Sequence, residues 1–249
     1  MCLLSFSWQP DSDTPLTLVS NRDEFHKRPT AAAEFWEQHP DLLAGKDLEA
    51  GGTWMGVTKG GRFAALTNVR QLPAPYQGTI SRGNLVKDFL TGQQSPEDYL
   101  NNIEGQKYDG FNLIVGDQNQ CWYLGNRPLD SHPIQLQAGI YGLSNAQLNT
   151  PWPKTQLAKN VLEQWLSTDA SKPKLHTLLN SQDKYETSQL PETGIGEPWE
   201  TLLSSAFIVS PEYGTRACTS LTIHRSHTEW TEATMSPEGL EVSSVEYSF

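Results

Sequence analysis

The sequence predicts an α+β fold: two mainly antiparallel sheets packed face to face, with helices on their outer faces, in a layered αββα sandwich. Two observations favour this fold. Hairpin signals precede a central block of helical spacing, and strand-like segments return after it, up to the end of the chain. No composition shift or linker divides the 249 residues, so we expect a single domain over residues 1–249.

Paired strands open the chain. Residues 2–8 alternate so that Cys2 and three large apolar side chains share one face, and an apolar run over 16–21 follows after a polar turn. These two segments predict a hairpin. A second hairpin is expected from 53–58 and 63–69, which flank a Lys-Gly-Gly turn.

Between and after the hairpins the pattern changes. We expect an irregular stretch over 26–50, because it carries two prolines and several acidic residues. A helix over 81–90 has Ser81 as its expected N-cap, and helices over 95–100 and 153–166 follow from capping and apolar spacing. Residues 180–200 predict an exposed loop, and further strands are expected at 111–115, 120–124, 134–143, 206–209, 216–224, 228–235 and 242–247.

Charge and cysteine content exclude several classes of protein. The formal net charge is −11 and the acidic residues are scattered, which argues against a nucleic-acid-binding surface. The N-terminus lacks a basic leader and no apolar run reaches membrane-spanning length. Cys2, Cys121 and Cys218 are too widely spaced for a metal pair or an obvious disulfide framework, so we expect a reducing, cytoplasmic compartment. His224 and His227 are interpreted as solvent-facing strand or turn residues, and no metal site is expected.

Cys2 is the first candidate for chemistry. Removal of the initiator methionine is favoured when the next residue is small, and Cys2 would then carry both a thiol and a free α-amine. An α-amino group titrates near ~7.7–8.0 and a thiol near ~8.5, so proton transfer between them at neutral pH is nearly balanced. The alternative is that Cys2 is a small buried hydrophobe on its strand.

Four polar residues, Asn21, Arg22, Asp23 and Glu24, come directly after the second apolar strand. If this strand pairs with the first, its end lies close to Cys2. Arg22 would then lower the thiol pKa, and Asp23 would hold an α-ammonium group. The four residues are therefore candidates for ligand binding, and a solvated turn is the alternative.

Asn68 and Asn145 each follow a hydroxyl residue at the end of an apolar strand. A side-chain amide donates hydrogen bonds without changing its protonation, which suits an oxyanion hole, whereas a turn-forming asparagine is the alternative. Arg216 opens a late strand and is a candidate for holding an anionic group, unless it is an ordinary surface arginine. Trp54 would supply an apolar wall.

Several motifs in this order resemble one family over essentially the whole chain. The resemblance is carried by the initial Met-Cys, Asn21-Arg22-Asp23-Glu24, Gly51-Gly52-Thr53-Trp54-Met55-Gly56, Ala65-Leu66-Thr67-Asn68, Tyr141-Gly142-Leu143-Ser144-Asn145 and Tyr213-Gly214-Thr215-Arg216. The family that these motifs resemble is the NRDE family, also called the transport and Golgi organisation protein 2 family.

That family in turn resembles the penicillin V acylase and bile-salt hydrolase branch of the N-terminal-nucleophile hydrolases. The resemblance implies their αββα scaffold and a hydrolase of non-peptide amides or thioesters that needs no cofactor. Arg22 and Asp23 are adjacent here, whereas those hydrolases space the matching residues apart. The implied catalytic residues are Cys2, Arg22, Asp23, Asn68, Asn145 and Arg216.

For the family itself, the resemblance implies intracellular binding and trafficking of an amphipathic metabolite, in the first place heme, with delivery to a heme-accepting protein. Two alternatives stay open: a Cys2 amidohydrolase or acyl-transfer enzyme, and a binder of acyl-coenzyme A or a lipid metabolite. The sequence has no Cys-Pro pair and no Cys-x-x-Cys-His motif, so His26 is the candidate axial ligand of any heme. The sequence does not define an oligomeric state.

Overall fold

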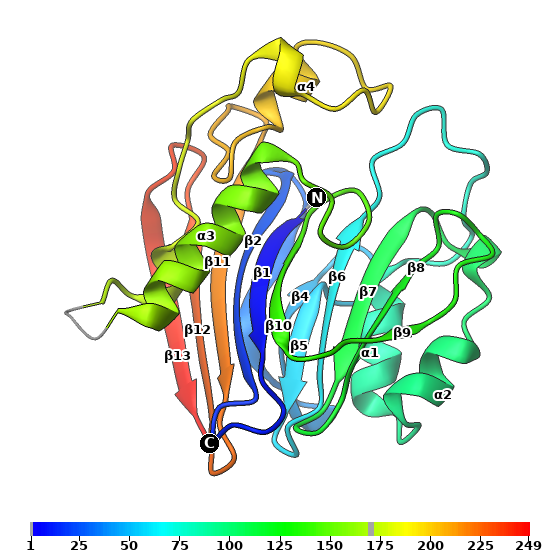
Figure 1. The fold of residues 1–249 in the computed structure, drawn as a ribbon, viewed down its shortest axis with the longest axis vertical. Coiled ribbons are helices and arrows are strands. Elements are labelled where there is room, and N and C mark those ends of the chain that lie inside the picture. The colour runs from blue at the N-terminus through cyan, green and yellow to red at the C-terminus, as the bar shows by residue number, and fades with distance from the viewer. Residues whose placement is uncertain (1, 169–171) are drawn as a thin grey trace.

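The computed structural model describes residues 2–168 and 172–249. Within these residues the chain forms thirteen strands and four α-helices (Figure 1). The strands make two antiparallel sheets, one of six strands and one of seven, which we call sheet I and sheet II. The expected α+β architecture of two mainly antiparallel sheets is confirmed.

Sheet I has the strand order β10-β1-β2-β11-β12-β13. The β1–β2 pair is the hairpin expected at the N-terminus, and β2 extends to Phe25, beyond the expected end. Because β11 pairs with the other edge of β2, residues from three parts of the sequence meet along this strand. The bounds are β1 Cys2–Trp8, β2 Leu16–Phe25, β10 Gly139–Leu143, β11 Tyr213–Ile223, β12 Thr228–Met235 and β13 Glu241–Ser248.

Sheet II is a meander whose strand order follows the sequence. The turn between β5 and β6 contains Gly61 with a φ of +79°, a conformation that favours glycine, and this confirms the second expected hairpin. The bounds are β3 Thr30–Trp36, β4 His39–Asp47, β5 Met55–Thr58, β6 Phe63–Asn68, β7 Phe111–Gly116, β8 Cys121–Gly125 and β9 Ile134–Gln135.

Helices α1, α2 and α3 lie on the outer faces of the sheets. Helix α3 crosses sheet I in Figure 1, while α1 and α2 cover sheet II. Helix α2 begins as expected, with Ser95 Oγ accepting from the Asp98 N–H, but Arg82 and not Ser81 takes the cap position of α1. No helix in the described residues is long and apolar enough to cross a membrane. The bounds are α1 Gly83–Thr91, α2 Pro96–Asn101, α3 Pro153–Ser167 and α4 Trp199–Leu202.

Three apolar clusters lie between the four layers. The central cluster fills the space between the two sheets and includes Phe6, Trp8 and Phe63. A second cluster joins sheet II to α1 and α2, and a third joins sheet I to α3. Side-chain alternation explains the division, since β1 directs Leu4 into the central cluster and Leu3 into the helix cluster.

The expectation of an irregular stretch over 26–50 is wrong, because β3 and β4 occupy most of it. Its prolines do not interrupt the sheet. Pro29 precedes β3, which is an edge strand, and Pro40 lies beside an irregularity in the β3–β4 pairing. Proline is tolerated at sheet edges, strand starts and bulges, where its missing N–H breaks no ladder.

Two other expected strands differ. Residues 134–143 form two short strands, because the chain crosses from sheet II to sheet I at Leu136, which is buried in the central cluster. Residues 206–208 are buried and Val209 is half-buried, but residues 206–209 form no strand. The backbone there makes isolated hydrogen bonds instead of a strand ladder: Phe207 N donates to Ser181 O, and Thr215 N donates to Ile208 O.

The central cluster should dominate stability. Phe6 is fully buried and its ring stacks on Tyr141 at 5.1 Å, so Phe6→Ala should lower the free energy of unfolding by about 3–5 kcal/mol. Val242→Ala, at a side chain that is 62% exposed, is the control and should change it by less than about 0.5 kcal/mol. Chemical denaturation measures both, and equal effects would contradict the layered core.

Candidate active site

The pairing of β1 with β2 brings Cys2 opposite Arg22. Both side chains lie on the face of sheet I that is directed toward sheet II, since they share the alternation of Leu4 and Leu18. Cys2 is therefore at the rim of the central cluster, where the two sheets end. The expectation that the end of the second strand lies beside Cys2 is confirmed.

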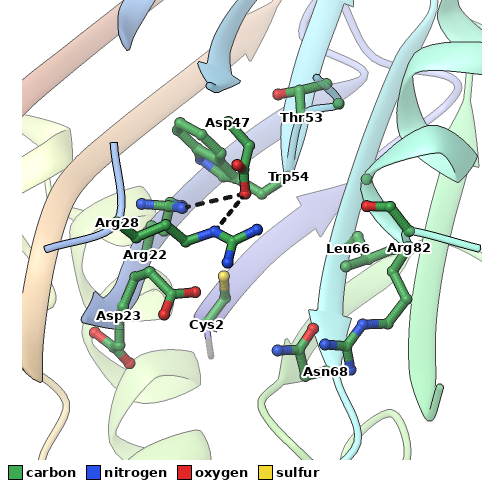
Figure 2. A pocket seen from close by; sticks show the side chains of 14 residues that line it. Cys2, Arg22, Asp23, Arg28, Asp47, Thr53, Trp54, Leu66, Asn68 and Arg82 are labelled. Atoms are coloured by element: carbon green, nitrogen blue, oxygen red, sulfur yellow. Dashed lines mark hydrogen bonds and ion pairs between the residues drawn. The ribbon is translucent and has the colours of Figure 1, made fainter. Parts of the chain in front are cut away.

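A cavity of about 150 Å³ opens at this rim (Figure 2). Both sheets and the start of α1 contribute to it, so its walls come from five separate parts of the sequence. The lining residues are Cys2, Arg22, Asp23, Glu24, Arg28, Asp47, Gly52, Thr53, Trp54, Leu66, Asn68, Ser81, Arg82 and Gly83. We call this cavity the Cys2 pocket.

Two glycines let α1 reach the Cys2 pocket. A Cβ atom on Gly52 would lie 2.5 Å from the carbonyl carbon of Gly83, so a larger residue would push the helix away. The close approach is accompanied by a 3.3 Å hydrogen bond from Thr53 N to Gly83 O. Arg82, which directly precedes α1, is thereby held in the wall of the pocket.

Arg22 is almost completely buried, with 5% of its surface exposed. Its guanidinium carbon lies 4.2 Å from the centroid of a Trp54 ring, its Nη1 donates to Thr30 Oγ1 at 3.3 Å, and its Nη2 is 4.0 Å from Asp47 Oδ2. A planar guanidinium on an aromatic face keeps its charge in a partly dry site. This geometry supplies a fixed positive charge next to Cys2.

A second arginine, Arg28, is fixed in the same wall by the carboxylates of Asp47 (Figure 2) and Glu49. Arg28 Nε donates to Asp47 Oδ2 at 2.7 Å, and its Nη1 donates to Glu49 at 3.2 Å. Asp47 Oδ1 accepts from the N–H groups of Glu49 and Ala50. Burial acts to raise the pKa of Asp47, but these hydrogen bonds and the Arg28 charge outweigh it and hold the pKa below its usual value.

Arg28, Asp47 and Arg82 line the pocket but were not predicted from the sequence. The first two lie in the segment interpreted as irregular, and the ladder that positions Asp47 was not expected there. One signal was present in the sequence. Asp47 is followed by a Gly-Gly pair four residues later, a combination typical of a tight turn with a side-chain acceptor.

The two hydroxyl-asparagine pairs lie side by side. Thr67 Oγ1 donates to Ser144 O at 2.5 Å, and Asn145 Nδ2 donates to Asn68 O at 2.9 Å. Asn68 lines the Cys2 pocket, whereas Asn145 is fully buried behind it and is not part of the lining. The structure thus places Asn68 at the pocket and gives Asn145 a supporting position.

Asp23 lies in the pocket wall and is buried, and its Oδ1 accepts from Thr215 Oγ1 at 2.7 Å. Burial raises the pKa of Asp23, against the opposing charge of Lys154.

Lys154 itself is buried at the start of α3, donates to Leu203 O, and has its pKa lowered to about 8 by burial. Its spacing with Ala158 and Leu162, at i, i+4 and i+8, was the sequence signal for a buried position.

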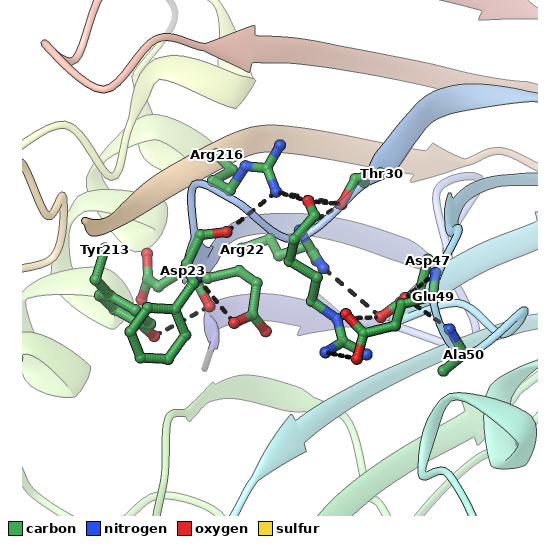
Figure 3. Close-up of polar contacts among 11 residues, drawn as sticks. Arg22, Asp23, Thr30, Asp47, Glu49, Ala50, Tyr213 and Arg216 are labelled. Carbon is green, nitrogen blue, oxygen red and sulfur yellow. Dashed lines mark hydrogen bonds and ion pairs between the residues drawn. The ribbon is translucent and has the colours of Figure 1, made fainter. Parts of the chain in front are cut away.

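Two other predicted residues, Asn21 and Arg216, lie around the pocket rather than in it. Asn21 is on the opposite face of β2, where its amide donates to Leu179 O and Ala206 O. Arg216 donates to the carbonyls of Phe25 and Arg28, so it supports the turn that carries Arg28 (Figure 3). By contrast, Glu24 and Trp54, which were predicted as ligand-binding residues, line the pocket.

His26, the candidate heme ligand, lies outside the lining of the Cys2 pocket. Its Nε2 is 3.0 Å from Ser210 O, and its backbone N–H donates to Glu212 O. The ring is therefore engaged with the segment that precedes β11. An axial role for His26 would require this contact to be broken.

The Cys2 thiol is buried at the bottom of the pocket. Burial raises its pKa, the Asp23 charge adds to this effect, and the Arg22 charge opposes it. The thiol is thus protonated at neutral pH unless a base accepts its proton. Any nucleophilic role for Cys2 depends on such a base.

A larger cavity of about 570 Å³ adjoins the Cys2 pocket, and Asn68 and Arg82 form part of both walls. The segment that follows β6 supplies most of its lining, together with Arg127. We call it the adjoining cleft. One of its lining residues, Arg70, forms a buried ion pair of 3.0 Å with Glu200.

The Arg28–Asp47 pair predicts a dependence of stability on pH. Because the folded pKa of Asp47 is lowered, its stabilising contribution is present above about pH 4 and is lost as the pH falls through the folded value. Asp47→Asn should lower the free energy of unfolding by about 1–3 kcal/mol at pH 7. The difference from wild type should shrink toward pH 3, measured by urea denaturation.

The control is Asp41→Asn. The Asp41 carboxylate is 80% exposed, and its ion pair with Lys59 Nζ is long, at 3.7 Å. This change should leave both the stability and its pH profile close to wild type. An Asp47→Asn variant whose deficit stays constant from pH 7 to pH 3 would contradict the assigned interaction.

Comparison with known proteins identifies the family of this chain. The family model described as Transport and Golgi organisation 2 matches residues 1–237. The human Transport and Golgi organization protein 2 homolog is 36% identical over 266 residues, covering 96% of this chain and 95% of the relative. The mouse homolog is 35% identical over 260 residues, covering 94% and 93%.

Among solved structures, the C2A mutant of a conjugated bile acid hydrolase from Clostridium perfringens matches with a TM-score of 0.51 and 10% identity. The match covers 99% of this chain and 97% of that chain, and at this identity it shows the fold alone. The αββα sandwich is thus of the N-terminal-nucleophile-hydrolase type. The chain belongs to the Transport and Golgi organisation 2 family.

Proposed function

We propose that this protein cleaves or transfers an acyl group held in a non-peptide amide or thioester, with Cys2 as the nucleophile. One observation carries the proposal: the Cys2 thiol opens into a small pocket that also presents Asn68, Asp23 and three arginines. A thiol, a neutral amide donor and fixed positive charges are the groups that acyl transfer uses. A buried cysteine with a purely packing role would have no need of them.

In the proposed first step, the Cys2 sulfur attacks the carbonyl carbon, and the thiol proton passes to the α-amine of Cys2 once Met1 has been removed. The carbonyl oxygen becomes an oxyanion. The carbon–nitrogen or carbon–sulfur bond then breaks, and the leaving group takes the proton from the α-ammonium. The product is a thioester on Cys2 and a free amine or thiol.

In the second step, water attacks the thioester carbonyl and gives one proton to the same α-amine. The bond to Cys2 breaks, and the proton returns to the sulfur. A carboxylic acid leaves, and the thiol is restored. If an amine or thiol replaces water as the attacking group, the same cycle transfers the acyl group to it.

The surrounding residues have separate roles in this proposal. Asn68 would donate to the oxyanion, and removal of such a donor typically costs on the order of 10²–10³ in rate. Asn145 would position Asn68 through its hydrogen bond to the Asn68 carbonyl. Asp23 would hold the α-ammonium, and Arg22 would favour the thiolate.

The sizes of the two cavities support a substrate that occupies both of them. The Cys2 pocket, at about 150 Å³, is smaller than the roughly 300–1,000 Å³ of small-molecule sites, while the adjoining cleft, at about 570 Å³, falls within that range. The reacting carbonyl would lie at Cys2 and the rest of the molecule in the cleft. Arg82 and Arg127 in the cleft favour an anionic group there.

The adjoining cleft also favours a second candidate function, the binding and delivery of an amphipathic metabolite such as heme or acyl-coenzyme A. Its volume suits such a ligand, and arginines are frequent partners of carboxylates and phosphates. Absence of a saturable hemin spectrum, and of transfer to an apo-acceptor protein, would exclude the heme form of this candidate. Acyl-coenzyme A would be tested as both ligand and substrate.

The enzymatic proposal predicts a specific loss of turnover. On a panel of N-acyl amides and acyl thioesters, protein with a mass-verified native N-terminus should release the acyl group, and Cys2→Ala should not, because it lacks the attacking sulfur. Cys218→Ala is the matched control, since Cys218 is also buried but is not part of the lining of the Cys2 pocket. Full turnover by Cys2→Ala would end the proposal.

A further inference from the structure

The turn between β11 and β12 brings two histidines together. His224 N donates to His227 O at 2.8 Å, which closes a four-residue turn and places the two side chains at its two ends. Their rings stack at 4.3 Å between centroids with an interplanar angle of 12°. From the sequence they were interpreted as solvent-facing strand or turn residues with no metal site, so the contact between their rings is a structural finding.

Glu229 completes the cluster. It lies in β12 two residues after His227, on the same face of the strand, because side chains alternate along a strand. The His224 Nε2 is 3.8 Å from Glu229 Oε2, and the His227 Nε2 is 3.4 Å from Glu229 Oε1. One ligand atom from each residue lies within 4.8 Å of those of the other two.

Both rings are oriented by hydroxyl groups on their other side. The His224 Nδ1 is 2.9 Å from Thr14 Oγ1, and the His227 Nδ1 is 3.0 Å from Ser226 Oγ. An Nδ1–H that donates to a hydroxyl leaves the lone pair on Nε2, the atom that faces Glu229. Such contacts behind the ring are typical of metal-binding histidines, because they fix the ring and its tautomer.

The turn is also held in place from outside. Arg225 N donates to Asp13 O at 2.9 Å, and its guanidinium donates to carbonyls of Pro10 and Gln118. Gln118 Nε2 donates in turn to His224 O. Two neighbouring loops thus anchor the turn, and the positive charge of Arg225 is engaged by carbonyl oxygens.

We infer that His224, His227 and Glu229 bind a divalent transition-metal ion, with Zn²⁺ as the best match. Two imidazoles and one carboxylate are an established zinc ligand set, with water in the fourth position. Zinc–ligand distances of about 2.0–2.2 Å put tetrahedral ligand atoms roughly 3.3 Å apart. The His227–Glu229 separation is already 3.4 Å, and the exposed Glu229 carboxylate can rotate toward both half-buried rings.

This site is independent of the proposed function. β11 pairs with β2 so that Ala217 lies opposite Arg22, near Cys2, whereas Ile223 lies opposite Leu16, at the other end of sheet I. In Figure 1 the β11–β12 turn accordingly lies at the bottom of the view, and the N-terminus lies at the top. The formal net charge of −11 favours the approach of a cation.

The test uses Zn²⁺ alone with the full chain, after chelation and dialysis, followed by titration calorimetry. Wild type should bind one ion per chain, and His224→Ala, His227→Ala and Glu229→Gln should each weaken binding at least tenfold. His132→Ala, at another exposed histidine, is the control and should leave the affinity unchanged. No saturable binding, or equal affinity in wild type and the three variants, would overturn the inference.

A second measurement uses the wild-type chain alone, so it tests the inference even if a variant fails to fold. Co²⁺ bound to the wild-type chain should give the visible absorption of a tetrahedral site, and added Zn²⁺ should displace it. Zn²⁺ should also raise the melting temperature of wild type, because it binds the folded chain. An absorption spectrum identical to that of the aqueous Co²⁺ ion would contradict the site.

Discussion

The register between β1 and β2 is the constraint on which the rest of the site depends. Cys2 lies opposite Arg22, and the same alternation that turns Cys2 toward sheet II turns Asn21 toward the outer face of sheet I, where it donates to Leu179 O and Ala206 O. A shift of one residue would exchange the two faces of the strand. Cys2 would then lie under α3, and Leu3, now buried there, would replace it at the pocket. Burial of both faces of sheet I makes such a shift costly.

A second constraint joins the two sheets at the pocket. β6 belongs to sheet II and β10 to sheet I, yet the residues at their ends exchange hydrogen bonds, from Thr67 to Ser144 and from Asn145 to Asn68. These contacts fix Asn68 relative to Cys2, although the two lie on different sheets. Fixed relative positions are what the proposed acyl transfer would need, because a nucleophile and an oxyanion donor must meet one carbonyl group.

Much of this arrangement could be predicted from the sequence, because it depends on local patterns. The alternation around Cys2 gave the inward face of β1, and polar residues after an apolar strand indicated a site at the end of β2. The resemblance to the family indicated the scaffold. Asn68 and Asn145 were predicted in equivalent roles, but packing gives them different positions, one in the lining and one behind it.

What could not be predicted depends on pairing between distant segments. Arg28 and Asp47 lie on either side of a hairpin whose prolines suggested irregular structure, so their ion pair was invisible in the sequence. Residues 134–143 read as one strand because a local pattern does not say which sheet a strand joins. The contact of His224 with His227 depends on the geometry of one turn, and spacing alone gives solvent exposure as the simpler interpretation.

The proposed reacting centre consists of the Cys2 thiol and its own α-amine. The most direct measurement is the intact mass and N-terminal peptide sequence of catalytically active protein purified from its own host. The account predicts that Met1 is absent and that the chain begins at Cys2, with an acyl probe attached to that residue after reaction. Active protein that retains Met1 would contradict the account, because the amine would then be blocked by a peptide bond.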